Sequence, residues 1–331
     1  MTSPLRRGLP IVAAGFGAMV LAVMAAPFIG STDISLARVF SSSVPFADNV
    51  DAQIFFIARL PRALAAALVG GTLAAAGVVF QGLLRNALAT PYTLGVSAGA
   101  SLGAMVAITF GTSWAVGGIA TASLAGAFLA VLIVYALAAA RHRGLSTTVL
   151  LLAGVTLNAF FSALILFVQY ISDFAQTYRA LRWLMGDLDV AGYAPILYAL
   201  PLVFISFAAF AWLARPLNIV SVSAEVAGSR GVPVERVQRL AFFSASLATG
   251  AAVSVGGPIG FIGIIVPHFV RLLVGADHRL VLPVSVLLGG TFLVACDVIA
   301  RTVFAPIELP VGIITAVIGG PFFLWLLIVR R

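Results

Sequence analysis

The chain alternates long apolar runs with short polar segments, and most of the runs are long enough to be membrane helices. A helix that crosses the hydrocarbon core of a bilayer needs about 20 mainly apolar residues. The pattern therefore predicts an all-α polytopic membrane protein, a single transmembrane domain over residues 1–331. The ten expected spans are residues 9–29, 56–84, 91–110, 114–140, about 147–170, 192–213, 240–255, a broken run within 256–279, 280–300 and 310–329.

The eighth run, Gly256–Arg279, is apolar but is interrupted repeatedly by Gly and Pro. From Ile259 to Phe269 it offers only about 11 residues, and His268 and Arg271 bring polarity back. A helix this short cannot span, and irregular backbone at membrane depth is tolerated only where it is buried in protein or lines a watery cavity. We expect this segment to pack inside the bundle, beside a transport path. A second short, Gly-rich run lies at residues 91–103. Together with the eighth run it forms a pair of broken helices, one in each half of the chain, which is a weak sign of an inverted repeat.

The charged residues divide unevenly between the two sides of this topology. The side that carries both termini holds 13 Arg and 3 acidic residues, and the other side holds 6 Arg and 8 acidic residues. Because cytoplasmic loops are enriched in basic residues, both termini are expected in the cytoplasm. The longest cytoplasmic polar stretch is residues 215–239, and residues 171–190 are expected to form a short external helix and loop. Arg59, Arg62 and Arg301 lie on the outer side, against the rule.

Composition excludes several classes of function. The chain is 62% hydrophobic and 9% charged, and all 19 basic residues are Arg. Without Lys it has neither a phosphate-binding loop of the Gly-Lys-Ser/Thr type nor a lysine Schiff base, so any ATP has to bind another chain. The net charge of +8 comes from Arg scattered between apolar spans, which does not indicate nucleic-acid binding. Cys296 is the single cysteine and cannot form an internal disulfide.

No ionisable residue is expected near the middle of a span, although proton- and sodium-driven carriers usually place relays or ion ligands there. Asp297 comes closest, and it lies four residues before Arg301, where it is expected to form a weak ion pair within one helix. The three His residues are far apart, so no metal site is predicted. Energy is therefore expected from an attached domain, although an ion-coupled secondary transporter of a small organic solute remains the alternative. No nucleophile–base pair suggests an enzyme.

Three long motifs resemble the FecCD family, the permease subunits of type II ABC importers for ferric siderophores, haem and vitamin B12. They are RLPRALAAALVGGTLAAAGVVFQGLLRNALATPYTLGVSAGASLGA (59–104), GPIGFIGIIVPHFVRLLVGADHR (257–279) and VACDVIARTVFAPIELPVGIITAVIGGPFFLWLL (294–327). The resemblance covers nearly the whole chain. It implies a multi-pass subunit of the bacterial inner membrane, paired with a second copy of itself. It also implies two ATP-binding cassette subunits, which would bind the ATP and Mg, and a periplasmic or surface substrate-binding protein.

The resemblance also implies roles for individual residues. Arg59, Arg62 and Arg301 match positions that dock the binding protein; the competing interpretation is Arg at helix ends reaching for the membrane surface. The segment SAEVAGSRGV matches the helices that couple to the ATPase. The residues implied are Ala224, Glu225, Ala227, Gly228, Arg230 and Gly231 for coupling; Asn86, Leu88, Ser146 and Thr147 for a cytoplasmic gate, or simply for capping and turns; and Asn158, Ser162, Gln169 and Thr315 for the pathway wall.

Overall fold

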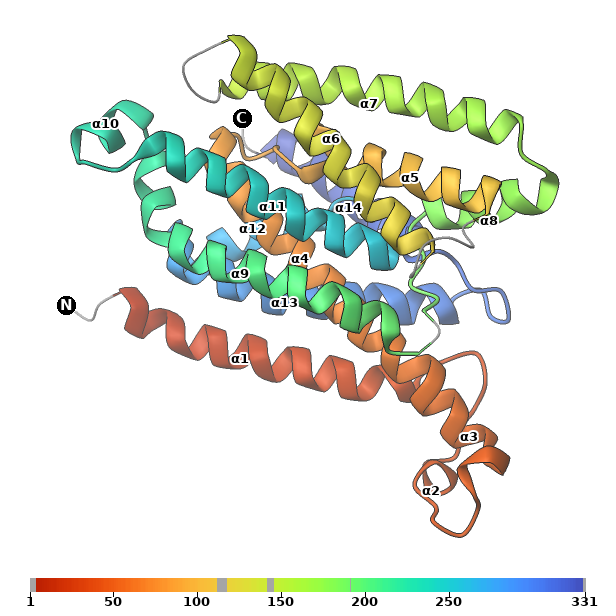
Figure 1. Cartoon of the computed structure of the whole chain (residues 1–331). Coiled ribbons are helices and arrows are strands. Elements are labelled where there is room, and N and C mark those ends of the chain that lie inside the picture. Colours follow the sequence, from red (N-terminus) through yellow and green to blue (C-terminus); the bar gives the residue numbers. More distant parts are fainter. Residues whose placement is uncertain (1–3, 112–117, 142–145, 191, 330–331) are drawn as a thin grey trace.

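The computed structural model describes residues 4–111, 118–141, 146–190 and 192–329, and these residues form a bundle of helices with no strand. Most of the long helices run side by side (Figure 1). The helices are α1 (Pro4–Ala25), α2 (Leu36–Val39), α3 (Val50–Gln53), α4 (Leu60–Leu84), α5 (Val96–Phe110), α6 (Ile119–Arg141), α7 (Thr147–Tyr170), α8 (Phe174–Leu184), α9 (Ala194–Val220), α10 (Ala224–Ser229), α11 (Val234–Gly256), α12 (Ile262–Val274), α13 (His278–Thr302) and α14 (Val311–Val329). Within this part of the chain the all-α prediction is confirmed.

Seven of these helices are long and apolar enough to cross a membrane, namely α1, the continuous α3–α4 segment, α6, α7, α9, α11 and α13. Three shorter apolar helices, α5, α12 and α14, complete the set in the described residues. These ten elements are the ten that the sequence pattern predicts. The short members include the two expected broken runs, since α5 has 15 residues and α12 has 13.

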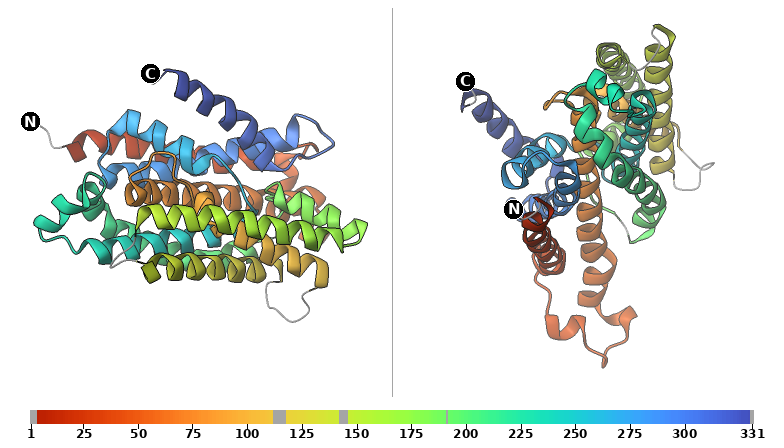
Figure 2. Two further views of the ribbon diagram at one scale, coloured as in Figure 1. Left: turned by 90° about the horizontal axis from the view of Figure 1, so that it is seen from above. Right: turned by 90° about the vertical axis from the view of Figure 1, so that its left-hand side faces the viewer.

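Helix α4 forms the centre of the bundle and packs against α13, α11, α12 and α9. Glycines allow this close packing, because a Cβ atom on Gly70 would lie 2.3 Å from the carbonyl oxygen of Gly289 on α13. Lipid is as apolar as Leu, so membrane helices associate mainly through such close contacts between small residues. By contrast, α1 lies at the edge of the bundle and buries only 11% of its span (Figure 2).

Two helix boundaries differ from the prediction. The sixth span was expected to end at residue 213, before Arg215 and Pro216, but α9 continues to Val220. Leu213, Leu217 and Val220 are buried at helical spacing, so the packed face continues beyond the polar residues. The second span begins earlier than residue 56, because Asn49 caps α3 by accepting a bond from the Ala52 amide at 3.1 Å. A π-helical turn, Ile54–Arg59, then joins α3 to α4.

The termini and short helices define two ends of the bundle (Figure 1). The end that we call the α10 end carries the beginning of α1 and the α9–α10–α11 connection. The opposite end, the α8 end, carries α2, α3 and α8. Candidate functional residues gather at both ends.

Candidate functional sites

The three anomalous arginines line one pocket at the α8 end. Arg59 comes from the π-helical turn, Arg62 from α4 and Arg301 from α13, and Glu308 from the α13–α14 loop completes a cavity of about 180 Å³. We call these four residues the arginine pocket. The structure therefore brings together all three arginines that the sequence motifs single out, although Arg301 lies more than 230 positions after the other two.

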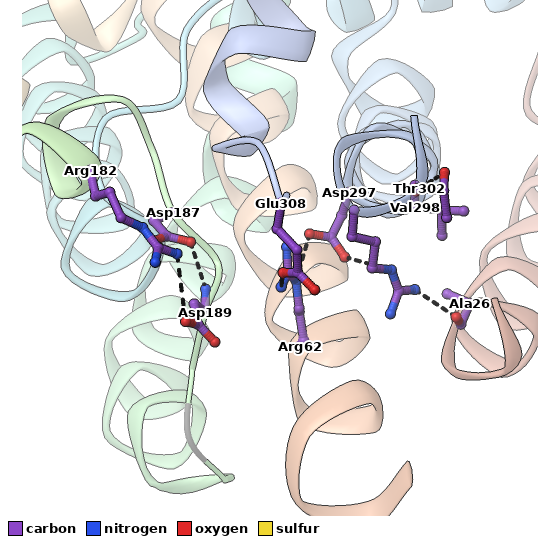
Figure 3. Close-up of polar contacts among 10 residues, drawn as sticks. Ala26, Arg62, Arg182, Asp187, Asp189, Asp297, Val298, Thr302 and Glu308 are labelled. Atoms are coloured by element: carbon purple, nitrogen blue, oxygen red, sulfur yellow. Dashed lines mark hydrogen bonds and ion pairs between the residues drawn. The ribbon is translucent and has the colours of Figure 1, made fainter. Parts of the chain in front are cut away.

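Arg62 is the centre of the ion pairs in this pocket (Figure 3). Its Nε donates to Asp297 at 2.8 Å, and its Nη1 donates to Glu308 at 2.5 Å. Asp297 is 1% exposed and lies 3.7 Å from Arg301, so it is shared by two arginines. The expected pair with Arg301 within one helix is present, but the closest partner of Asp297 is Arg62 on α4 and the cluster is buried, which the sequence did not predict.

Arg59 and Arg301 bind backbone carbonyls of the connection between α1 and α2. Arg59 donates to Thr32 at 2.5 Å and to Pro27 at 3.2 Å, and Arg301 donates to Ala26 at 2.6 Å. All three arginines are less than 9% exposed. They are held inside the subunit, and the competing picture of side chains reaching freely from helix ends does not describe them.

Glu308 is the pocket residue that the sequence motifs did not single out. Its side chain is 38% exposed, in contrast to the buried Asp297. The sequence could have drawn attention to Glu308, because it is the single acidic residue after Asp297 and lies within the same motif. Its approach to Arg62 depends on the fold of a loop, which spacing in the sequence does not reveal.

At the α10 end, a short helix projects between α9 and α11 (Figure 1). Ser223 caps α10 by accepting from the Val226 amide at 3.3 Å, and Gly231 turns the chain with a φ of 76°. Only Ala227 of the six predicted coupling residues is buried; the others are exposed or half-exposed. The predicted hairpin is therefore present, with α10 as its short helix and the beginning of α11 as its second arm.

The four predicted gate residues lie in two connections at the same end. Asn86 is exposed and accepts from the Leu88 amide at 2.9 Å, and Leu88 is itself 44% exposed. Ser146 caps α7 through the Val149 amide at 3.5 Å, with Thr147 as the first helical residue. The turn and capping roles are confirmed, and the gate role stays a prediction.

The predicted wall residues do not form one surface within the subunit. Ser162 is exposed on α7 and Gln169 is half-exposed. Asn158 instead points inward and donates to the Tyr92 carbonyl at 2.7 Å. Thr315 on α14 is fully buried and donates back to Gly312 at 3.0 Å. A pathway role for the set therefore stays a prediction.

The broken stretch is packed inside the bundle, as expected. Ile259 and Ile262 are fully buried, and the Tyr92 hydroxyl donates to the Ile259 carbonyl at 2.5 Å. Gln81 of α4 links the two ends of α12, since it donates to Gly263 at 2.8 Å and accepts from Arg271 at 2.6 Å.

The turn between α12 and α13 is held by a polar cluster. Asp277 accepts from the Asn218 amide at 2.7 Å and from the Arg279 side chain at 2.6 Å, and Asn218 in turn accepts from His278 Nδ1 at 2.7 Å. The hydrogen bonds from Arg279 and Asn218 hold the pKa of the Asp277 carboxyl well below its usual range. This cluster fixes the end of α9 to the start of α13.

No group of three or more His, Cys, Asp or Glu side chains that could hold a metal ion occurs in the described residues. The polar clusters at the two ends are built from Arg, carboxylates, Asn218 and His278.

Comparison with known proteins places the chain. The model of the FecCD transport family matches residues 18–329. The chain is 46% identical over 269 residues to the cobalamin import system permease protein BtuC of Halobacterium salinarum, covering 81% of this chain and 72% of that protein. It is 36% identical over 330 residues to the hemin transport system permease protein HmuU of Yersinia pestis, covering 97% of each.

A solved structure agrees with the sequence relatives. A metal-chelate type ABC transporter in an inward-facing conformation superposes with a TM-score of 0.83 at 31% identity, over 97% of this chain and 99% of that chain. PsaBC from Streptococcus pneumoniae shares the fold at 17% identity, with a TM-score of 0.51. With a family match over nearly its whole length and relatives of this similarity, the chain belongs to the FecCD transport family, a family of membrane permease subunits of ABC transporters.

Proposed function

We propose that this chain is the permease subunit of an ATP-driven importer that carries an iron chelate, haem or cobalamin across the bacterial inner membrane. The cargo classes are those named for the relatives with 36–46% identity, and the structure of a metal-chelate type transporter is similar over 97% of this chain. In this proposal two copies of the chain enclose the path, and both termini lie in the cytoplasm.

The observation that carries the proposal is the placement of two different polar sites at opposite ends of one apolar bundle. The arginine pocket at the α8 end would receive acidic side chains of a substrate-binding protein, because three arginines gather there and the carboxylate on Arg62 Nη1, Glu308, is partly exposed and can be displaced. Charges placed in this way steer the encounter and fix the orientation of a partner.

Helix α10, at the other end, would dock into an ATP-binding cassette subunit. Its exposed small residues allow close approach, and Gly228 has open space around it. This chain has no Lys for a nucleotide-binding loop, so ATP and Mg would bind to that partner, and this chain would need no cofactor of its own.

The proposal is tested by uptake into vesicles that hold the reconstituted complex. Uptake is expected to stop when the catalytic Glu of the ATPase subunit is replaced by Gln, whether or not a proton gradient is present. Uptake that continues on a proton gradient alone would contradict the proposal and favour the ion-coupled alternative.

Coupling is tested by Gly228→Pro, with Gly228→Ala as the matched control. Proline removes a backbone donor from the six-residue helix α10 and clashes with the preceding turn. We expect Gly228→Pro to abolish cargo-stimulated ATP hydrolysis, and Gly228→Ala to keep most of it because the added methyl meets no atom within 4 Å. Normal stimulation in the proline variant would argue against the role of α10.

A further inference from the structure

An apolar groove runs along the outside of the bundle, away from both sites described above. Two adjoining cavities, of about 360 and 570 Å³, share Phe207 of α9 and Pro283 and Val286 of α13. The first is floored by Ala75 of α4, and the second is closed by α1 at Phe16. Each cavity falls within the range of roughly 300–1,000 Å³ typical of ligand sites. We call the pair the α1–α9–α13 groove.

The groove lies between α1, α9 and α13 and begins at the α10 end. Gly8 of α1 packs on Leu280, and Gly15 packs on Leu287, so α1 and α13 run in the same direction and form parallel walls. The wall from Arg279 to Leu287 is about 12 Å long at 1.5 Å per residue. An extended hydrocarbon chain fits such a slot better than a folded peptide does.

The α10 end of the groove carries an excess of positive charge. Arg279 lines the cavity itself, and Arg215 is exposed one helical turn beyond the lining residue Ala211. Among the described residues at this turn, one carboxylate stands against these two arginines, Asp277, which accepts from Nε and Nη2 of Arg279.

We propose that the α1–α9–α13 groove binds an acidic phospholipid, with an acyl chain between the three helices and the phosphate against Arg215 and Arg279. A phosphate accepts several charge-assisted hydrogen bonds from guanidinium groups. Basic pockets between membrane helices on the cytoplasmic side are typical sites for anionic headgroups. A free anion would leave the apolar slot unused, and a zwitterionic lipid would leave the excess of arginine unmatched.

Lipid retention by the purified full-length chain tests this proposal. After delipidation in detergent, the protein is titrated with phosphatidylglycerol or with phosphatidylcholine of the same acyl chains, and bound lipid is counted by native mass spectrometry. We expect tighter retention of phosphatidylglycerol, and about a tenfold loss of that preference in Arg215→Gln/Arg279→Gln, because each basic residue near a membrane surface contributes several-fold. Arg179→Gln, an exposed arginine of α8, is the matched control and should change nothing.

A second variant tests the apolar part independently of charge and of the Asp277 contacts. Ala211→Phe should fill the groove and lower phosphatidylglycerol retention, while Ala136→Phe on the exposed face of α6 should not. Equal retention of the two lipids by the unaltered protein, or no difference between the groove variants and their controls, would overturn the proposal. Glycerol phosphate that competes as well as the lipid would also overturn it, because it would reveal a simple anion site.

Discussion

At the scale of single residues, Asp297 holds the arginine pocket together. It is almost fully buried and lies within 4 Å of two arginines, one on its own helix and one on α4. A buried carboxylate of this kind compensates charges that could not otherwise remain inside the protein. Its main role is therefore structural, and the more exposed Glu308 is the residue free to respond to a partner.

Replacing Asp297 with Asn is expected to destabilise the subunit by about 3–5 kcal/mol, because it leaves Arg62 and Arg301 buried without their shared counter-charge. The midpoint of thermal unfolding in detergent measures the effect. The control is Asp187→Asn, whose partner Arg182 has 40% of its side chain exposed. That change should cost about 0–1 kcal/mol. Equal shifts in the two variants would mean that the buried cluster contributes no special stability.

Glu308→Gln is expected to strengthen capture of the binding protein by about tenfold. A tenfold change corresponds to roughly the free energy of one charge-assisted hydrogen bond, and the partner's carboxylate would no longer have to break the bond between Glu308 and Arg62. Glu308 occupies Nη1 of Arg62, so an incoming carboxylate has to displace it. Surface plasmon resonance on the permease in nanodiscs would measure the change. Glu225→Gln at the opposite end is the control; weaker or unchanged capture in Glu308→Gln would show that Glu308 is no competitor.

The arginines of the pocket could be predicted from the sequence, but their surroundings could not. Motif resemblance and the unusual charge distribution both selected Arg59, Arg62 and Arg301. Their burial depends on contacts with Pro27, Ala26 and other residues far away in the chain, which no local pattern encodes. For the same reason, spacing predicted that Asp297 pairs with Arg301 and missed its closer pairing with Arg62.

At the scale of elements, short broken helices are positioned by contacts between glycines. A Cβ atom on Gly77 of α4 would lie 2.2 Å from the carbonyl oxygen of Gly263 on α12, and Gln81 binds that same carbonyl one turn later. Helix α12 therefore lies against α4 at backbone contact. The Gly/Pro pattern predicted that this segment is buried, whereas the partner helix became evident only in three dimensions.

Gly77→Ala should separate α4 from α12 and cost about 1–3 kcal/mol, the usual range for adding a methyl group to a packed core. Gly17→Ala is the matched control, because Gly17 lies within α1 with no atom within 4 Å of an added Cβ. That control should be neutral or stabilising by up to about 1 kcal/mol. The midpoints of thermal unfolding of the two variants measure this difference. An unchanged midpoint in Gly77→Ala would show that α4 and α12 can move apart at little cost.

Helix ends were the least predictable feature, and α9 shows the reason. Arg215 and Pro216 both signal the end of a span, and the polar segment was expected to begin there. The buried residues Leu213 and Leu217 nevertheless continue the packed face, and tertiary packing outweighs local preference.

At the scale of the whole molecule, the proposed orientation puts the α8 end outside the membrane and the α10 end in the cytoplasm. Ser42 lies in the connection between α2 and α3, at the α8 end, and Ser229 ends α10; both are exposed. The single native cysteine, Cys296, is buried, so labelling by a maleimide reports on the introduced cysteine alone. A membrane-impermeant maleimide is expected to label Ser42→Cys in intact cells, and Ser229→Cys only after the membrane is opened. The opposite labelling pattern would reverse the proposed orientation.

One backbone feature links the broken stretch to the last helix. Phe261 has a φ of 68° at the start of α12, a conformation that is unfavourable for any side chain with a Cβ. Its ring lies directly over Gly319 of α14, where even a methyl group would collide with it. Any sliding of α14 along α12 would therefore have to separate this ring from Gly319, so the contact couples the position of the last helix to the start of α12.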